Sequence, residues 1–338
     1  MSDIPRGAIR FNVDSNKPEL WDGSQWAEFQ LSTPNMGRSA DRQPGARGVI
    51  SEAHRSGSSG FITYINISST GDAQDFGALT NPRFNAAAVG SQKTRGVFGA
   101  GLGSPSNASI NVIEFVTIAS TGSATDFGDT LDPNYVPGAV SSSTRGIWGG
   151  GANFPASPTL IDVMQYITIS STGNTVDFGN LTDGCWCSAG LASPTRGIFA
   201  QGFTPSVVNN LDFITISTLG NAIDFGDLTV ARAGTNGAGS KVRGLFMGGY
   251  NPTVLNVIDY VTIASAGNAA NFGDLTEVAR FGGATSDSRR AVLCGRYTPS
   301  GSNIIDYVEI VTEGDAVDFG DTTAATQASA TSSGHGGL

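Results

Sequence analysis

Charged side chains are scarce in this chain. Asp, Glu, Lys and Arg make up 14% of its 338 residues, and lysine occurs only at Lys17, Lys93 and Lys241. The formal net charge is −10. Phosphate binding needs a cationic surface, so this composition argues against nucleic acid as a partner.

Cysteine and histidine are also few. Three cysteines, Cys185, Cys187 and Cys294, make no disulfide framework, and a zinc site would need a fourth ligand. A copper site like that of galactose oxidase would need two histidines. The chain has only His54 and His335, which lie at opposite ends of the sequence. We therefore expect no metal and no cofactor.

Long apolar runs are missing. No stretch approaches the roughly 20 apolar residues of a membrane span. The first residues, Met1-Ser-Asp-Ile-Pro, are polar, and no apolar segment of a signal peptide follows. We expect synthesis in a cytoplasm and no membrane insertion.

A repeat dominates what is present. Asp-Phe-Gly, or a near copy, returns six times in steps of 51, 51, 47, 47 and 47 residues, with its phenylalanines at Phe76, Phe127, Phe178, Phe225, Phe272 and Phe319. An arginine, usually followed by glycine, also recurs once in each repeat, at Arg47, Arg95, Arg145, Arg196, Arg243 and Arg290. Repeats of this length fit one four-stranded propeller blade. The predicted fold is all-β, a six-bladed β-propeller with four antiparallel strands per blade.

The fifth copy illustrates one blade. Its predicted strands, in order, are 234–240, 243–249, 256–263 and 271–275, with a hairpin turn at 265–268. The third strand carries apolar residues on both faces, which is typical of a strand buried on both sides. A helix is a poor alternative because β-branched residues dominate and glycine recurs.

Length varies in one place within the repeat, between the arginine and the aromatic residue of the third strand. That interval connects strands two and three, so the variation falls on one face of the ring. Insertions gathered on one side mark the binding side of a repeat array. Aromatic residues collect there at Phe84, Tyr135, Phe154, Trp186, Phe203, Tyr250, Phe281 and Tyr297. The candidate binding residues are Phe154, Trp186, Phe203, Tyr250 and Tyr297.

Ring closure has two candidate solutions. We expect residues 327–333 to complete the blade that begins at Arg47 and so to join the two ends of the ring. In the alternative, residues 39–44 supply that strand. Either arrangement would remove exposed strand edges.

Residues 7–31 lie outside the repeat and alternate like a three-stranded meander. So few strands form too small a core to be stable alone. We therefore expect a docking or oligomerisation domain at 1–35, with the propeller at 36–338. Its candidate docking residues are Phe11, Trp21, Trp26 and Phe29.

The recurring residues have structural interpretations. Each Asp-Phe-Gly phenylalanine is expected to pack between blades, and the repeat arginines to pair with Asp75, Asp126, Asp177, Asp224 and Asp318. Asn271 replaces the aspartate in the fifth blade. Calcium binding at Asn174/Asp177 and Asn221/Asp224 is an alternative to ordinary hairpin turns.

Two segments resemble known families. Residues 7–26 look like the short meander of tail-fibre and other virion proteins of tailed bacteriophages. The repeat core, seen in Asn256-Val-Ile-Asp-Tyr-Val-Thr-Ile263 and Asn271-Phe-Gly-Asp-Leu-Thr276, is similar to kelch-like repeats in structural proteins of phages that infect marine bacteria and cyanobacteria. The repeats lack the Tyr and Trp pattern of cellular kelch repeats.

The resemblance implies a non-enzymatic virion structural protein of the tail, fibre, neck or capsid. Its implied partners are other virion proteins and a host-surface glycan or protein, with homo-oligomerisation through 1–35 as a further option. A free kelch-like or lectin-like binding module without a virion role is the alternative. A hydrolase is a weaker option, because glycosidase chemistry needs paired carboxylates and the predicted inner strands are rich in Ser, Ala and Gly.

Overall fold

The computed structural model describes Pro5 and residues 7–12, 17–21, 23–28, 46–53, 60–91, 94–154, 159–186, 188–298, 301–324 and 327–338. The chain divides into two compact units, 1–43 and 44–338. The predicted boundary between residues 35 and 36 lies outside the described ranges.

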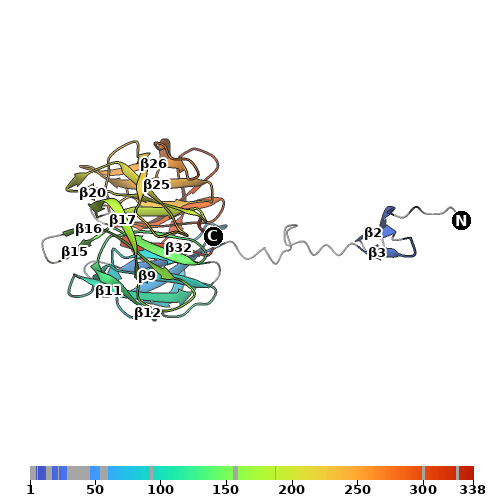
Figure 1. Ribbon diagram of the computed structural model, residues 1–338, viewed down its shortest axis with the longest axis horizontal. Helices are drawn as coiled ribbons and strands as arrows, with labels where there is room; N and C mark the ends of the chain where they lie inside the picture. Colours follow the sequence, from blue (N-terminus) through green and yellow to red (C-terminus); the bar gives the residue numbers. More distant parts are fainter. Residues whose placement is uncertain are drawn as a thin grey trace. The chain divides into compact units, whose positions relative to one another are not determined.

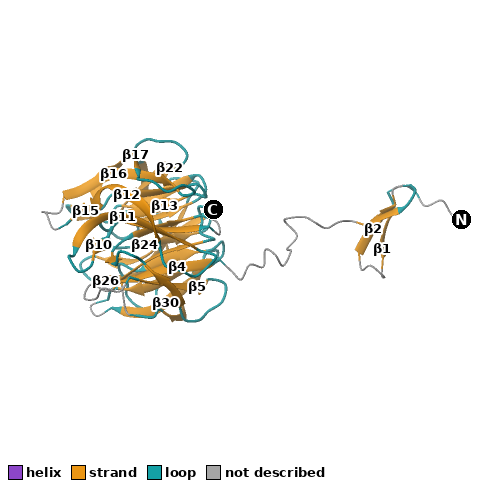
Figure 2. Cartoon of the chain, turned by 90° about the horizontal axis from the view of Figure 1, so that it is seen from below, coloured by secondary structure: helices purple, strands orange, loops and turns teal. Residues whose placement is uncertain are grey.

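The second unit is a six-bladed β-propeller (Figures 1 and 2). Every described element is a strand or an irregular connection, and no helix occurs among the described residues. Contacts between innermost strands run in a closed circuit from blade to blade. The predicted fold class is therefore confirmed.

Each blade has four antiparallel strands, numbered from the axis outward. The first strands are β32 (Gln327–Ser332), β8 (Ala87–Gly90), β13 (Gly138–Ser141), β18 (Ala189–Ala192), β24 (Asn236–Gly239) and β28 (Gly283–Ser286). The second strands are β4 (Arg47–Ala53), β9 (Arg95–Gly99), β14 (Arg145–Gly149), β19 (Arg196–Ala200), β25 (Arg243–Tyr250) and β29 (Arg290–Arg296).

The outer half of each blade follows the same pattern. The third strands are β5 (Phe61–Asn66), β11 (Ala108–Thr117), β16 (Thr159–Thr168), β22 (Asn210–Thr215), β26 (Val254–Thr262) and β30 (Ser302–Glu309). The fourth strands are β6 (Gln74–Ala78), β12 (Thr125–Asn134), β17 (Val176–Cys185), β23 (Ile223–Asp227), β27 (Ala270–Asp274) and β31 (Val317–Asp321). Short extra strands lie in the connections: β7 (Arg83–Phe84), β10 (Leu102–Gly103), β15 (Ala152–Asn153), β20 (Phe203–Thr204) and β21 (Ser206–Val207).

The connections define two faces of the propeller. The constant face carries the turns from first to second strand and from third to fourth strand. The variable face carries the connections from second to third strand and from each fourth strand to the next blade. Figures 1 and 2 show β15 at the variable face and the C-terminal end of the chain at the constant face.

Gln327–Ser332 (β32) is the segment expected to close the ring. It pairs with β4 over six residues, from Gln327↔Ala53 to Ser332↔Gly48. Residues 39–44, the alternative, lie outside the described part of the chain. The first blade therefore joins strands from both ends of the propeller sequence.

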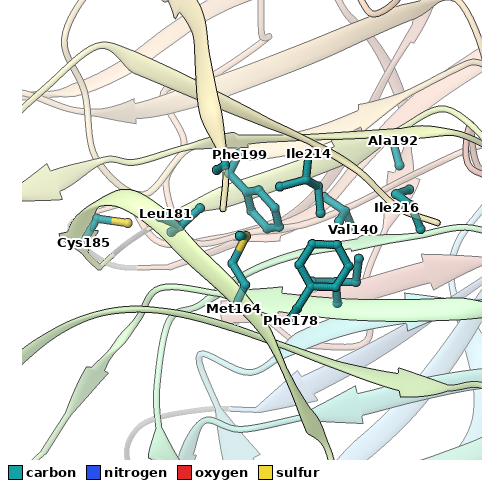
Figure 3. Close-up of a cluster of buried hydrophobic side chains, with 11 residues drawn as sticks. Val140, Met164, Phe178, Leu181, Cys185, Ala192, Phe199, Ile214 and Ile216 are labelled. Carbon is teal, nitrogen blue, oxygen red and sulfur yellow. The ribbon is translucent and has the colours of Figure 1, made fainter. Parts of the chain in front are cut away.

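The Asp-Phe-Gly phenylalanines pack between blades, as predicted. Phe178, for example, is 2% exposed in a cluster with Met164 of its own blade and Ile214 of the next (Figure 3). Each phenylalanine also meets the third-strand aromatic of its own blade edge-on, with ring centroids 5.9–6.1 Å apart. These clusters make the core a set of layers between neighbouring sheets.

The predicted pairing of repeat arginines with Asp-Phe-Gly aspartates is wrong. Asp75, Asp126, Asp177, Asp224 and Asp318 are all exposed, and no ion pair in the described part of the chain involves them. Successive side chains of a strand point to opposite faces, so an aspartate beside a buried phenylalanine faces solvent.

The arginines instead clamp neighbouring blades together. The Arg196 guanidinium lies 4.4 Å from the ring centroid of Phe213, and its Nη1 donates to the Ile263 carbonyl oxygen of the next blade at 2.9 Å. All six blades repeat this arrangement, and Arg290 closes the circle by donating to Ile67 of the first blade. We call this arrangement the arginine clamp.

Backbone contacts reinforce each junction. Gly220, in the hairpin turn of the fourth blade, donates its N–H to the Phe178 carbonyl of the third blade at 2.9 Å. Gly179 lies so close to this turn that a Cβ there would be 2.4 Å from the Gly220 oxygen. This spacing requires glycine at the third position of Asp-Phe-Gly.

Replacing Gly179 with alanine should destabilise the propeller more than replacing Gly220. Both residues have positive φ, +140° and +149°, but a Cβ on Gly220 meets no atom within 4 Å. Both substitutions therefore strain the backbone, but only Gly179→Ala also introduces a steric clash. We expect that variant to lose about 1–3 kcal/mol more unfolding free energy in urea titrations. Equal losses would contradict the close approach.

Removing one arginine clamp should destabilise the ring without changing the fold. Arg196→Met loses a charged hydrogen bond and a cation–π contact, which together contribute about 2–4 kcal/mol. Arg289→Met is the control, because Arg289 is exposed and should tolerate the change within about 0.5 kcal/mol. Chemical denaturation of both variants measures the difference, and similar stabilities would refute the clamp.

Candidate functional site

The variable face carries one pair of residues per blade junction, which we call the crown. In each pair, a residue beyond the fourth strand bridges a residue at the end of the next blade's second strand or shortly after it. The pairs are Phe84–Leu102, Tyr135–Ala152, Trp186–Phe203, Ala233–Tyr250 and Arg280–Tyr297. The equivalent positions of the sixth junction, residues 54 and 326, lie outside the described ranges. The first residue of the pair thus differs at each of the five described junctions, whereas the second is Leu, Ala or Phe at three of them and Tyr at two.

One half of the crown is a row of aromatic rings. Phe154, Tyr135, Trp186 and Phe203 follow one another with ring centroids 6.1, 5.6 and 5.7 Å apart. Phe154 is 36% exposed, whereas Tyr135, also part of the row, is buried. Such offset and tilted ring contacts are favourable beyond simple burial. The row therefore holds its exposed rings in place.

The other half of the crown is centred on a cation. The Arg280 guanidinium carbon lies 4.6 Å from the Tyr250 ring centroid and 4.8 Å from that of Tyr297. These tyrosines come from the fifth and sixth blades. Tyr250 is 36% exposed, so this cluster is open to solvent.

The backbone beside the crown is strained. Val136 and Phe281 have φ of 53° and 52°, a left-handed conformation that bulky residues rarely adopt. Each follows a crown residue, Tyr135 or Arg280, and equivalent positions at Asn85 and Gly234 also have positive φ. Strain of this kind persists only where surrounding structure enforces it, and it clusters at functional sites.

The structure gathers the predicted binding residues into two groups. Phe154, Trp186 and Phe203 belong to the aromatic row, and Tyr250 and Tyr297 flank Arg280. Phe84 and Tyr135 lie on the same face but are buried. Sequence reasoning overlooked Arg280, although its position in the repeat matches that of Trp186 and Tyr135.

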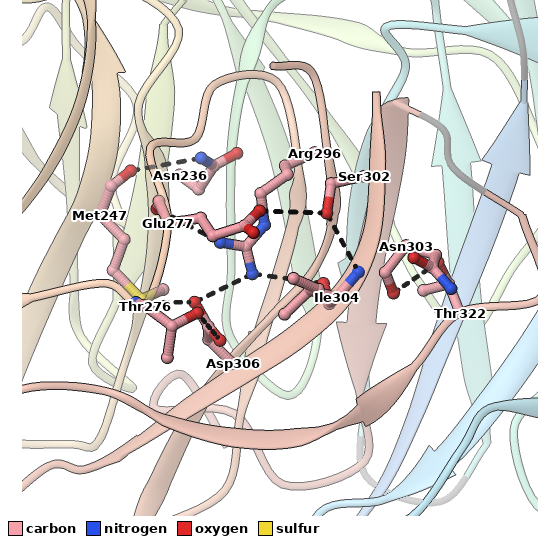
Figure 4. A network of polar contacts seen from close by, with 10 residues as sticks. All are labelled: Asn236, Met247, Thr276, Glu277, Arg296, Ser302, Asn303, Ile304, Asp306 and Thr322. Atoms are coloured by element: carbon pink, nitrogen blue, oxygen red, sulfur yellow. Dashed lines mark hydrogen bonds and ion pairs between the residues drawn. The ribbon is translucent and has the colours of Figure 1, made fainter. Parts of the chain in front are cut away.

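Buried acids anchor the crown from below, and sequence reasoning missed them as well. Asp306, which precedes the third-strand aromatic Tyr307, accepts a hydrogen bond from the Thr276 hydroxyl at 2.7 Å and pairs with Arg296 at 2.9 Å (Figure 4). The corresponding residues in four other blades are Glu114, Gln165, Asp212 and Asp259. The sequence signal that could have identified them is their recurrence directly before the third-strand aromatic residue.

These buried polar groups differ in the partners that stabilise their charge. Arg83 and Arg232 pair with Glu114 and Asp259, yet burial still lowers the pKa of both arginines. Asp212 has Gln201 in place of an arginine, with Nε2 donating at 2.9 Å, and burial raises the pKa of this carboxyl. The network holds the connection that leaves each fourth strand.

The axial channel is lined by small residues. Its half nearer the variable face is a cavity of about 100 Å³ lined by residues such as Ala87, Gly190, Thr235 and Gly283. The half nearer the constant face, about 60 Å³, ends at His335 and Gly336. There His335 Nε2 donates to the Gly90 carbonyl at 2.9 Å, and its Nδ1 accepts the Gly337 N–H at 3.2 Å.

The structure also locates most of the other residues that were considered as metal ligands. Asn174 and Asn221, considered for calcium, accept backbone N–H groups of Asp129 and Asn180 in the preceding blade at 3.0 Å. Cys185 and Cys294 are free and buried, and burial raises the pKa of both thiols. His54 and Cys187 lie outside the described residues. In the ranges that the structure describes, no cluster of three His, Cys, Asp or Glu side chains could hold a metal ion.

The N-terminal unit is a three-stranded sheet of β1 (Ile9–Asn12), β2 (Lys17–Trp21) and β3 (Trp26–Glu28). Trp21 and Trp26, two candidate docking residues, pair with ring centroids 5.4 Å apart, and Arg10 stacks over Trp26 at 4.3 Å. Phe29 and the side chain of Phe11 are not among the described parts.

No protein-family model matches the sequence, and a search of curated proteins finds no match. No helix in the described ranges is long and apolar enough to cross a membrane.

Acid should destabilise the propeller through His335. Burial lowers the pKa of His335 to about 4 from the ordinary 6.5, so the folded state keeps the imidazole neutral while the unfolded state takes up a proton. Stability is therefore unaffected above pH 6.5 and falls, by up to about 3 kcal/mol, between pH 6.5 and pH 4. His335→Gln should reduce the pH dependence of the unfolding free energy in this range, as measured by urea titration at each pH. An unchanged slope would contradict the assignment.

Proposed function

We propose that this protein is a non-enzymatic recognition propeller of a phage virion, held by its N-terminal meander and binding its target through the crown. The virion setting rests on the resemblance of residues 7–26 and of the repeat core to phage structural proteins. The binding role rests on the geometry of the propeller.

The observation that carries the binding role is the contrast between the two faces. The arginine clamp recurs in all six blades, with the same contacts on the constant face. The crown positions, by contrast, hold Phe, Tyr, Trp, Ala and Arg in turn. A repeated scaffold with individual residues on one face is the usual design of a repeat-protein binding surface.

The attachment point of the chain agrees with outward display. Ala46, the first described residue of the propeller, lies at the constant face, where its carbonyl accepts the Ile67 N–H at 3.0 Å. The described part of the propeller therefore begins at the face opposite the crown. Attachment through this end of the propeller would leave the crown free for a host-surface glycan or protein.

The channel supports a binding role over hydrolysis. Glycoside hydrolysis requires two carboxyl groups about 5–10 Å apart. The residues that line both axial cavities are Ala, Gly, Ser, Thr, Val, Leu, Pro, Asn and His. Exposed aromatic rings at the crown instead offer flat surfaces of the kind that bind sugar rings or apolar side chains.

The meander is proposed to dock on other virion proteins. Its three short strands cannot supply an independent core, so the paired rings of Trp21 and Trp26 need a partner to cover them. Association with further copies of the meander is the competing arrangement.

Mass spectrometry of purified particles tests the virion role directly. We expect the protein in particles, and we expect a deletion of residues 1–35 to abolish its incorporation. A double variant, Phe154→Ala/Phe203→Ala, should be incorporated normally but adsorb to host cells at least about tenfold less, with a thermal midpoint that shows a folded propeller. Absence from particles would favour a free binding module, and unchanged adsorption would remove the crown from the mechanism.

A further inference from the structure

Arg280 differs from the buried arginines at the variable-face end of the blades. Arg83, Arg232 and Arg296 are fully buried, and each is paired with an acid. Arg280 is partly exposed, and no carboxylate of the described residues lies within ion-pair distance of it. Its charge is stabilised by the faces of Tyr250 and Tyr297 instead.

The tyrosines also orient the guanidinium. The guanidinium carbon lies over both tyrosine rings and 5.5 Å from the centroid of Phe281, so these contacts restrict its rotation before a ligand arrives. The Arg280 Nε is buried without a hydrogen-bond partner, as are the Nε atoms of Arg83, Arg232 and Arg296, so a ligand would meet the outer nitrogens of this partly exposed guanidinium.

A second unpartnered group lies beside this cation. Phe281, next to Arg280, donates its N–H to the Gly234 carbonyl at 3.1 Å, which brings Thr235 into the same neighbourhood. Thr235 lines the cavity nearer the variable face, and its buried hydroxyl has no partner in the described part of the chain. The backbone contact between Phe281 and Gly234 thus links the Arg280 cluster to the rim residue Thr235, although Arg280, Tyr250 and Tyr297 do not themselves line the cavity.

We propose that Arg280, between Tyr250 and Tyr297, binds the carboxylate of an acidic sugar. This proposal rests on the proposed binding role of the crown and names the chemistry of its ligand. A guanidinium matches a carboxylate in planar, bidentate geometry, and the tyrosine rings offer faces for the sugar. The net charge of −10 would repel a polyanion. A single localised cation therefore fits a ligand that places one carboxylate at the site.

The test uses the full-length protein and a glycan panel. The probes are uronate- and sialate-bearing oligosaccharides, each matched with its carboxyl-reduced form, and titration calorimetry measures the affinity. We expect at least one acidic member to bind at least about tenfold more tightly than its reduced form. Binding of no acidic member, or equal binding of both forms, overturns the proposal. Displacement by equimolar sulfate also overturns it, because the site would then recognise any oxyanion.

Matched variants assign the effect to Arg280. Arg280→Gln should lose the preference for the acidic form. Arg280→Lys should retain part of it, because the charge remains and the bidentate geometry does not. Arg289→Gln, an exposed arginine on the constant face, should bind like the wild type. Unchanged thermal midpoints exclude misfolding, and an Arg280→Gln variant that keeps the preference refutes the assignment.

The host-adsorption assay separates this proposal from the function on which it rests. If Arg280→Gln adsorbs normally while Phe154→Ala/Phe203→Ala does not, the crown binds its target without the cation and the carboxylate proposal fails. If both variants adsorb normally, the binding role of the crown fails too.

Discussion

The arginine clamp is the interaction on which the ring depends. A guanidinium stacked on the aromatic ring of its own blade reaches a carbonyl oxygen of the next blade, and this happens six times around the circle. The last clamp, from Arg290 to Ile67, joins residues 223 positions apart. Each blade is thereby held by its neighbours on both sides, and β32 completes the first blade from the other end of the sequence.

This repeated scaffold explains how the variable face tolerates different residues and strained backbone. The buried acids below the crown hold the start of each connection, and the layers of phenylalanine hold the sheets. Val136 and Phe281 can then keep a left-handed conformation that would be unfavourable in a loose loop. The stability of the constant face and the individuality of the crown are therefore parts of one arrangement.

Sequence reasoning succeeded where a contact follows from local periodicity. The spacing of Phe178 within its repeat predicted a blade, and the apolar faces of 256–263 predicted burial on both sides. It failed for the arginine–aspartate pairs, because opposite charges at recurrent positions suggested a contact that strand alternation forbids. The buried acids were overlooked for a related reason, since a charged residue such as Asp259 inside an apolar strand has no visible partner in the sequence.

The sequence by itself determined the number of blades, the order of strands within them and the face on which length varies, because these follow from spacing along the chain. Only the tertiary structure decided that Tyr135 is buried while Phe154 is exposed, and that Arg280 lies between Tyr250 and Tyr297. It also placed residues 335–337 across one end of the channel. These contacts join residues from different blades, so they depend on how the sheets curve into a ring, and no local pattern encodes that curvature.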